Sequence, residues 1–294
     1  MSHKAGYVNI IGNPNVGKST LMNAMVGEKL SVITSKAQTT RHRILGIVNH
    51  ENYQIIYSDT PGILKPSYKL QESMMVNVSQ AFDDADIFLY VVELNESIEK
   101  NKETISKLKN QKVPVILVIN KIDLDKNGEL TEIMKNWQDE LPDAEIIPVS
   151  AIEKFNLERI FNFILEFLPE APPYFEKDTL TDKSERFIVS EIIREKILTI
   201  YKKEIPYSVE VEIESFKKEE NIIRISAVIY VERDTQKGII IGNQGNMLKK
   251  VGTFARKDIE QFFEKKVFLE LFVKVNRNWR SNEKELKRFG YIRK

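Results

Sequence analysis

The chain has 294 residues with a formal net charge of +1, and it contains three histidines and no cysteine. The absence of cysteine excludes disulfide bonds and thiolate metal sites, and His3, His42 and His50 lie too near one end to predict a histidine-rich metal centre. No apolar run approaches the roughly 20 residues that a membrane-spanning helix needs, and the first residues lack the zones of a signal peptide. We therefore expect a cytoplasmic protein, and its length predicts two domains.

The charge is distributed unevenly along the chain. Residues 1–173 carry a net charge of −5, whereas residues 174–294 carry +6. Within residues 236–294 there are 15 basic and 6 acidic residues, which gives +9. Such a basic block indicates binding to nucleic acid or to an anionic membrane, with a solvated lysine-rich surface as the alternative explanation.

In the first half, short apolar runs alternate with helical patterns. Near-continuous apolar strands separated by helices predict an α/β domain with a mostly parallel sheet, helices on both faces and ligands at the carboxyl ends of the strands. The apolar runs are residues 7–12, 53–60, 86–94, 113–120 and 144–150.

A glycine loop, GNPNVGKS, follows the first apolar run and precedes a helical pattern. This context is the one that a phosphate-binding P-loop requires. The glycines let backbone N–H groups surround phosphate oxygens, Lys18 adds positive charge, and the Ser19 hydroxyl can bind magnesium. The residues predicted to bind nucleotide here are Gly12, Asn13, Asn15, Val16, Gly17, Lys18, Ser19 and Thr20.

The base-recognition element is expected after the fourth apolar run, where NKID extends from Asn120 to Asp123. Asp123 can accept hydrogen bonds from the N1–H and N2–H₂ groups of guanine, while Lys121 lies along the base. Adenine lacks this pair of donors, and such a mismatch can cost roughly 10⁴-fold in specificity. Ser150 and Ala151 complete the predicted pocket through their backbone, so GTP and GDP are the expected ligands.

The sequence DTPG, at the end of the second apolar run, predicts contact with magnesium and the γ-phosphate. Asp59 can hold magnesium through water, and the N–H of Gly62 can meet the γ-phosphate. Thr39 and Thr40 lie in the polar segment SKAQTTRHR, from which one threonine hydroxyl can complete the six oxygens that Mg²⁺ prefers. Thr40 is the predicted ligand, with Thr39 left open as the alternative. The predicted catalytic residues are Lys18, Thr40, Asp59 and Gly62, and the predicted metal ligands are Ser19, Thr40 and Asp59.

Together these motifs resemble those of small GTPases, and the arrangement PNVGKS, TTR, DTPG, NKID, SA is similar to the TrmE–Era–EngA branch. Ile63 stands where Ras-like proteins carry the glutamine that orients the attacking water, so hydrolysis is expected to be slow without a partner. In relatives of this branch an asparagine at the place of Asn15 helps to bind potassium, so the resemblance implies K⁺ as a further cofactor. Arg41 or Arg43 acting in cis is the alternative.

A proline-rich, charged segment separates the first half from a second region with an α+β pattern. We expect a GTPase domain at residues 1–170, a linker at 171–183 and a smaller domain with a basic C-terminal tail at 184–294. The elements expected in the smaller domain are a helix at residues 190–205, strands at 208–215 and 222–232, a helix at 246–266 and a strand at 267–275.

A second glycine loop, GNQG, precedes the helix expected at residues 246–266. It lacks the GK[ST] ending, so a second nucleotide site is not expected. Two glycines allow a nucleic-acid backbone to approach the main chain, and the helix N-terminus and the lysines that follow favour phosphate. The predicted RNA-binding residues are Gly242, Asn243, Gln244, Gly245, Lys249 and Lys250.

The segment around this loop, VIYVERDTQKGIIIGNQGNMLKKVGTFARKDIEQFF, resembles the core of a bacterial KH domain, which implies a clamp on about four nucleotides of single-stranded RNA. The order of P-loop GTPase and KH domain is similar to the Era family of ribosome-assembly GTPases. That resemblance implies binding to the 3′ end of 16S rRNA, assistance to 30S subunit assembly, no DNA partner, and some peripheral association with the inner face of the cell membrane. Trp279 is expected to be a packing residue rather than a base stacker.

The leading hypothesis is an RNA-binding GTPase whose switch loops, roughly residues 31–43 and 62–82, are ordered by the γ-phosphate and Mg²⁺. A second hypothesis is a membrane-associated or cell-cycle switch whose C-terminal module binds protein or anionic lipid. The GNQG loop favours the first, because a module used only for protein contact does not need it. A metabolic P-loop kinase is opposed by NKID and DTPG.

Overall fold

The computed structural model describes residues 2–36 and 38–292. The chain forms two compact units, each built from more than one stretch of sequence. Unit 1 comprises Met1–Ser31, Thr40–Lys65 and Met75–Asp182, and unit 2 comprises Val32–Thr39, Pro66–Met74 and Lys183–Lys294.

Unit 1 is a six-stranded sheet with strand order β2-β3-β1-β4-β5-β6. All neighbouring strands are parallel except β2 and β3, which are antiparallel. The strands are β1 (Lys4–Ile11), β2 (Ile44–Asn49), β3 (Tyr53–Asp59), β4 (Ile87–Glu93), β5 (Val115–Asn120) and β6 (Glu145–Pro148). The helices are α1 (Lys18–Val26), α2 (Lys69–Asp83), α3 (Lys102–Lys109), α4 (Leu130–Glu140) and α5 (Leu157–Phe167).

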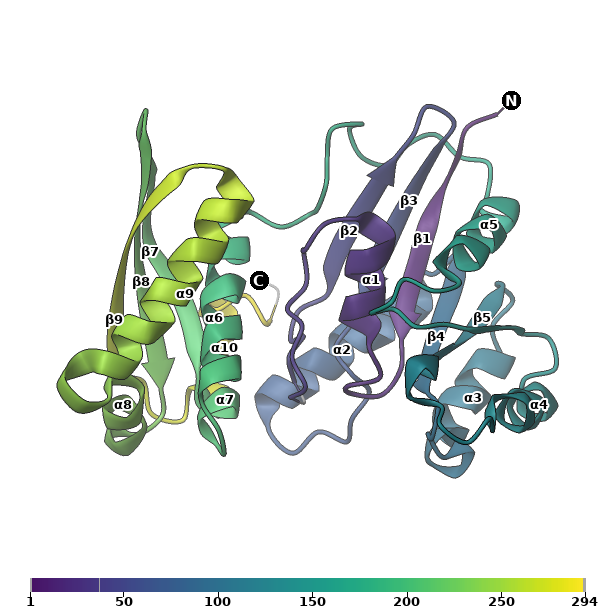
Figure 1. Ribbon diagram of the computed structural model, residues 1–294, viewed down its shortest axis with the longest axis horizontal. Helices are drawn as coiled ribbons and strands as arrows, with labels where there is room; N and C mark the ends of the chain where they lie inside the picture. The colour runs from purple at the N-terminus through teal and green to yellow at the C-terminus, as the bar shows by residue number, and fades with distance from the viewer. Residues whose placement is uncertain (1, 37, 293–294) are drawn as a thin grey trace. The chain divides into compact units, whose positions relative to one another are not determined.

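Helices cover both faces of this sheet, with α1 and α5 in front of it and α2 and α3 behind it in Figure 1. The central strand β4 is buried from Ile87 to Val92, as expected for a parallel strand that is covered on both sides. One core contains Phe88 and Tyr90 of β4, Ile105 of α3 and Trp137 of α4. The predicted mostly parallel α/β sheet is confirmed.

The edge strand β2 was not expected from the sequence. It pairs with β3 from Ile44 to Asn49, and its other edge is covered by the segment that follows unit 1's last helix. Ile47 N donates to Leu180 O at 2.8 Å, and Leu45 N donates to the Asp182 side chain at 3.0 Å. An edge covered in this way does not offer free backbone groups to another chain.

Unit 2 contains a three-stranded sheet with strand order β7-β8-β9, in which β7 is antiparallel and β9 parallel to β8. Helix α8 occupies a stretch that the residue pattern showed only as a short apolar segment, and it is the helix that the resemblance to a KH domain implied before the glycine loop. The strands are β7 (Glu210–Lys218), β8 (Ile222–Val231) and β9 (Lys266–Val275). The helices are α6 (Glu185–Ile200), α7 (Ile205–Ser208), α8 (Asp234–Ile241), α9 (Asn246–Phe263) and α10 (Glu283–Arg288).

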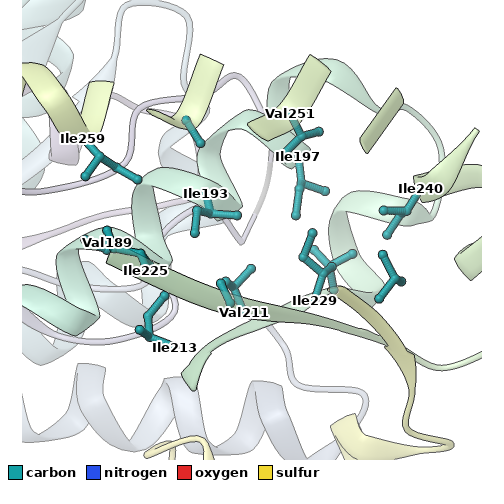
Figure 2. Packing of buried hydrophobic residues seen from close by; sticks show 14 of the residues in the cluster. Val189, Ile193, Ile197, Val211, Ile213, Ile225, Ile229, Ile240, Val251 and Ile259 are labelled. Atoms are coloured by element: carbon teal, nitrogen blue, oxygen red, sulfur yellow. The ribbon is translucent and has the colours of Figure 1, made fainter. Parts of the chain in front are cut away.

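Helices α6, α8 and α9 pack on the sheet through the cluster of branched aliphatic side chains in Figure 2. Val189, Ile193 and Ile197 recur every four residues on α6, which places them on one face of the helix. The helix expected at residues 190–205 begins earlier, because Ser184 caps it by accepting a hydrogen bond from Phe187 N. This arrangement confirms that the second domain is a smaller α+β domain.

Residues 69–82, which were included in the expected second switch loop, form most of α2. Trp279 is fully buried and donates from Nε1 to Ser208 O at 3.0 Å, so it is a packing residue. Within residues 2–36 and 38–292, no helix is long and apolar enough to cross a membrane.

Candidate nucleotide site and nucleic-acid groove

The first glycine loop connects the end of β1 to the start of α1, at the carboxyl edge of the sheet. Gly17 precedes α1 with a φ of +100°, and a Cβ atom there would lie 2.2 Å from Asn120 Nδ2, so only glycine fits. In this loop Val16 is buried, Asn13 is half-buried and Asn15 is exposed. The first turn of α1 therefore lies where unpaired backbone N–H groups can receive an anion.

Lys18 lies over this loop and is buried. Its ammonium group donates to Gly12 O at 3.0 Å and to Asn13 O at 2.8 Å. Burial lowers the pKa of Lys18 to about 8, and the carboxylates of Asp59 and Glu96 oppose this effect only in part. The lysine is thus held in place by neutral carbonyl groups that a phosphate group can replace.

Three side-chain oxygens converge beside the loop. Ser19 Oγ, next to the half-buried Thr20 in the first turn of α1, donates to Asp59 Oδ2 at 2.6 Å and lies 2.9 Å from Thr40 Oγ1. Thr40 Oγ1 is 3.3 Å from the same carboxylate oxygen. Among the described residues, none donates to Asp59 Oδ1, although that atom is buried. Burial raises the pKa of Asp59, and the hydrogen bond from Ser19 lowers it only in part. These oxygens form a group suited to a hard cation.

The two candidate threonines occupy different environments. Thr39 Oγ1 donates to Lys36 O at 2.5 Å and lies 2.6 Å from Thr34 Oγ1. Thr40 Oγ1 instead faces Ser19 and Asp59, as described above.

The DTPG segment runs beside the glycine loop, because Ile63 N donates to Gly12 O at 3.1 Å. This bond keeps the neighbouring Gly62 close to the loop. Arg43, considered above as a source of positive charge, donates to Asp84 Oδ2 at 2.6 Å and to Ser58 Oγ at 2.6 Å. A guanidinium held by these groups is not available to the loop.

The base-recognition segment is tied to the glycine loop by Asn120, which is 2% exposed. Asn120 Nδ2 donates to Val16 O at 2.9 Å, and Asn120 Oδ1 accepts from Ala151 N at 3.1 Å. Asp123 is exposed and accepts from Ser150 Oγ at 2.6 Å. The structure therefore brings together the three segments that were predicted to bind nucleotide.

Two acidic side chains at this edge were not predicted. Lys121 Nζ donates to Glu93 Oε2 at 2.5 Å, and Asn13 Nδ2 donates to Glu96 Oε1. Both carboxylates lie at or just after the carboxyl end of β4. The rule that ligands bind at the carboxyl ends of parallel strands is the sequence signal that marks them.

The second glycine loop joins α8 to α9, in unit 2 (Figure 1). Gly242 has φ +71° and ψ 178°, and a Cβ atom there would lie 2.5 Å from Met247 Cγ. Gly245 has φ +77°, with no atom of the described chain within 4 Å of its Cβ position. Asn243 and Gln244 are exposed. Gly242 is therefore required for packing, whereas Gly245 leaves open space above the backbone.

A groove of about 390 Å³ begins at Gly245 and continues between α9 and β9. Its apolar lining comes from Leu248, Leu269 and Leu271, and its basic residues are Lys249 and Arg256. Apolar walls with basic residues at the side can hold unstacked bases and their phosphates. Of the two lysines predicted to bind RNA, Lys249 lines the groove, whereas the exposed Lys250 lies outside its lining.

Comparisons with known proteins match both units. The family model described as 50S ribosome-binding GTPase matches residues 7–121, and the model described as KH domain matches residues 204–280. GTPase Era from Syntrophus aciditrophicus is 47% identical over 98% of this chain and 95% of its own length. GTPase Era from Clostridium kluyveri is 43% identical over 98% of this chain and 99% of its own length.

Solved structures of Era proteins are similar over essentially the whole chain. Era in complex with MgGDPNP and nucleotides 1506–1542 of 16S ribosomal RNA matches with a TM-score of 0.94 and 39% identity, covering 99% of this chain and all of that one. An Era variant from Aquifex aeolicus bound to GDP and aluminium fluoride matches with a TM-score of 0.94 and 38% identity, with the same coverage. The chain therefore belongs to the Era family of GTPases.

Proposed function

We propose that this GTPase binds single-stranded RNA near the 3′ end of 16S rRNA through the groove beside Gly245, and that it assists assembly of the 30S subunit. The observation that carries the proposal is the apolar, basic-edged groove that begins at this glycine. The Era structure with a 16S rRNA fragment supports the choice of RNA.

The guanine base is expected between the NKID and VSA segments. Asp123, exposed and oriented by Ser150, is the acceptor for the two guanine donors. Asn120 holds the pocket together, and Lys121 and Ala151 border the base. Gly12, Asn13, Val16, Gly17 and Thr20 form or adjoin the phosphate loop at the start of α1.

Mg²⁺ fits the group of oxygens formed by Ser19, Thr40 and Asp59. The buried Asp59 Oδ1, which has no hydrogen-bond partner among the described residues, supports this assignment, because a buried carboxylate oxygen requires a partner. The position of the Thr40 hydroxyl favours Thr40 over Thr39. When bound, Mg²⁺ would neutralise phosphate charge during phosphoryl transfer.

The chain's own residues position the phosphates. Lys18 would exchange its two carbonyl acceptors for phosphate oxygens, and Gly62 would offer its N–H to the γ-phosphate. Ile63 cannot orient water, and Arg43 is held by Ser58 and Asp84, which leaves the buried Arg41 or a bound cation as the source of the added positive charge. We assign the added positive charge to K⁺ bound beside the exposed Asn15. Equal hydrolysis rates in sodium and potassium buffers would contradict this assignment.

We further propose residues 1–170 as the GTPase domain, 171–183 as the linker and 184–294 as the KH domain with its basic tail. The units support the division between the two domains, with residues 171–182 of the linker packed in unit 1 and two short segments from the first half lying in unit 2. The protein would act in the cytoplasm, and the basic tail would provide a peripheral contact with the inner face of the cell membrane.

The test is crosslinking of the purified protein to total cellular RNA in its GDPNP and GDP states, followed by sequencing. Gly245→Asp places a carboxylate at the groove, and Gly290→Asp is the matched control. Both glycines have positive φ, +77° and +80°, and open space at the Cβ position. Enrichment of the 3′ end of 16S rRNA, lost only in Gly245→Asp, is expected. Background crosslinking in both states would contradict the proposal and favour a protein or lipid partner.

A further inference from the structure

Helix α6 carries a buried arginine whose contacts lead to the first expected switch loop. Arg194 is 1% exposed, and its Nε and Nη2 donate to the two carboxylate oxygens of Glu191 at 2.7 and 2.5 Å. The same Nη2 donates to the main-chain carbonyl oxygen of Thr39. Thr39 belongs with α6 to unit 2, so this contact lies within one compact unit.

Packing alone does not account for this arginine. The core side of α6 is formed by aliphatic residues such as Ile193 and Ile197, and hydrophobic replacement of a buried ion pair is often neutral or stabilising. Arg194 Nη1 is buried and has no acceptor among the described residues, which further disfavours burial of the guanidinium. A guanidinium buried at such a cost indicates a role for its contact with Thr39.

Two further contacts hold the segment Val32–Thr39 in unit 2. Lys36 Nζ donates to Tyr201 O at the end of α6. Gln38 Oε1 accepts from the Tyr68 hydroxyl at 2.8 Å, and the Arg280 guanidinium lies 4.8 Å from the centre of the Tyr68 ring. The first switch segment thus has several anchors in the unit that contains the groove.

The peptide bond after Thr39 connects this anchor to the candidate magnesium site. Because a peptide unit is planar, fixing the carbonyl oxygen of Thr39 restricts the direction of the Thr40 N–H and Cα atoms. In the structure, Arg194 holds that carbonyl while Thr40 Oγ1 lies 2.9 Å from Ser19 Oγ. Fixing the Thr39 carbonyl therefore limits how the Thr40 side chain can be directed.

We propose that Arg194, oriented by Glu191, is a positioning residue that holds Thr40 in its magnesium-binding arrangement and so couples the GTP state to the RNA-binding unit. The inference rests on the proposed function, because it needs both Mg²⁺ at Thr40 and RNA in the groove. GDP has no γ-phosphate to order the switch loop, so its affinity should depend little on Arg194.

Two variants test the inference. Glu191→Gln combined with Arg194→Gln removes both charges and avoids leaving a carboxylate buried without its arginine. Arg194→Lys keeps the charge beside Glu191 but loses the planar fork that reaches two acceptors. Lys196→Gln is the matched control, because Lys196 lies on the same helix and pairs with Asp258 of α9.

The measurement is the dissociation constant of Mg²⁺–GDPNP and of GDP for each folded variant, with and without an RNA fragment from the 3′ end of 16S rRNA. In both Arg194 variants we expect GDPNP binding to weaken roughly tenfold or more, as for loss of a hydrogen bond from a charged group, while GDP binding changes less than about twofold. The difference in RNA affinity between nucleotide states should shrink, and Lys196→Gln should resemble wild type.

An unchanged ratio of GDPNP to GDP affinity in both Arg194 variants would overturn the inference. An equal loss of both nucleotides would also overturn it, since that result indicates a general structural role. The wild-type protein tests the proposed function separately. That function is contradicted if the wild type binds no guanine nucleotide, or binds no RNA in any nucleotide state.

Discussion

The two glycines of the GNQG loop should respond differently to alanine. Gly242 has φ +71° and ψ 178°, a region that costs other residues about 1–3 kcal/mol. Its new Cβ would also lie 2.5 Å from Met247 Cγ, and overpacking of this kind costs about 1–3 kcal/mol. Gly245→Ala brings no close contact, so its cost is only that of an alanine in the left-handed backbone region, about 1–2 kcal/mol. The expected losses are therefore about 2–6 kcal/mol for Gly242→Ala and about 1–2 kcal/mol for Gly245→Ala.

Urea unfolding measures this difference. Trp279 is buried in unit 2, so its fluorescence in a Trp137→Phe background follows the unit that contains the loop. Gly290→Ala, at φ +80° with open space, should match Gly245→Ala. If Gly242→Ala destabilises the unit no more than Gly245→Ala does, the reasoning about Met247 is wrong.

Three other perturbations follow from the sites. Asn120→Ala leaves two backbone groups without their hydrogen bonds and should lower the free energy of unfolding by about 2 kcal/mol or more. Substitution of the exposed Asn127 by alanine should not lower it, and urea titration compares the two variants. Thr40→Ala should weaken Mg²⁺–GDPNP binding about tenfold and leave GDP binding unchanged. Excess EDTA should abolish the difference between this variant and the wild type. Equal losses of affinity for both nucleotides would refute the metal assignment. Lys249→Ala should reduce the slope of log RNA affinity against log salt concentration by about 0.7. Lys250→Ala should do so only if Lys250 contacts phosphate outside the groove. An unaltered slope in both variants argues against phosphate contacts on this side of α9.

The fold class could be predicted because its signals are local. Apolar strands ending in GNPNVGKS, DTPG and NKID determine both the parallel sheet and the edge at which the motifs meet. Asn120 and Asp123 were predicted as site residues for the same reason, since Asn120 ends β5 and Asp123 lies three residues beyond it. The structure adds their partners, which come from segments far away in the sequence.

The features that were missed depend on tertiary contacts. Strand β2 is short and follows a polar segment, so only its pairing with β3 identifies it. Helix α8 contains Gly238 and an isoleucine run, which resembles a strand as much as a helix, so only the resemblance to a KH domain implied a helix there. Arg194 and Thr39 are separated by 155 positions, and no local pattern connects them.

The GTP site and the RNA groove are proposed to be coupled within one chain. The most direct test of this coupling is the dissociation constant of Mg²⁺–GDPNP, measured with and without saturating RNA from the 3′ end of 16S rRNA. The account predicts that RNA changes GDPNP affinity, and that GDPNP changes RNA affinity by the same factor, because the coupling must be reciprocal. Identical GDPNP affinities with and without bound RNA would show two independent sites and contradict the account.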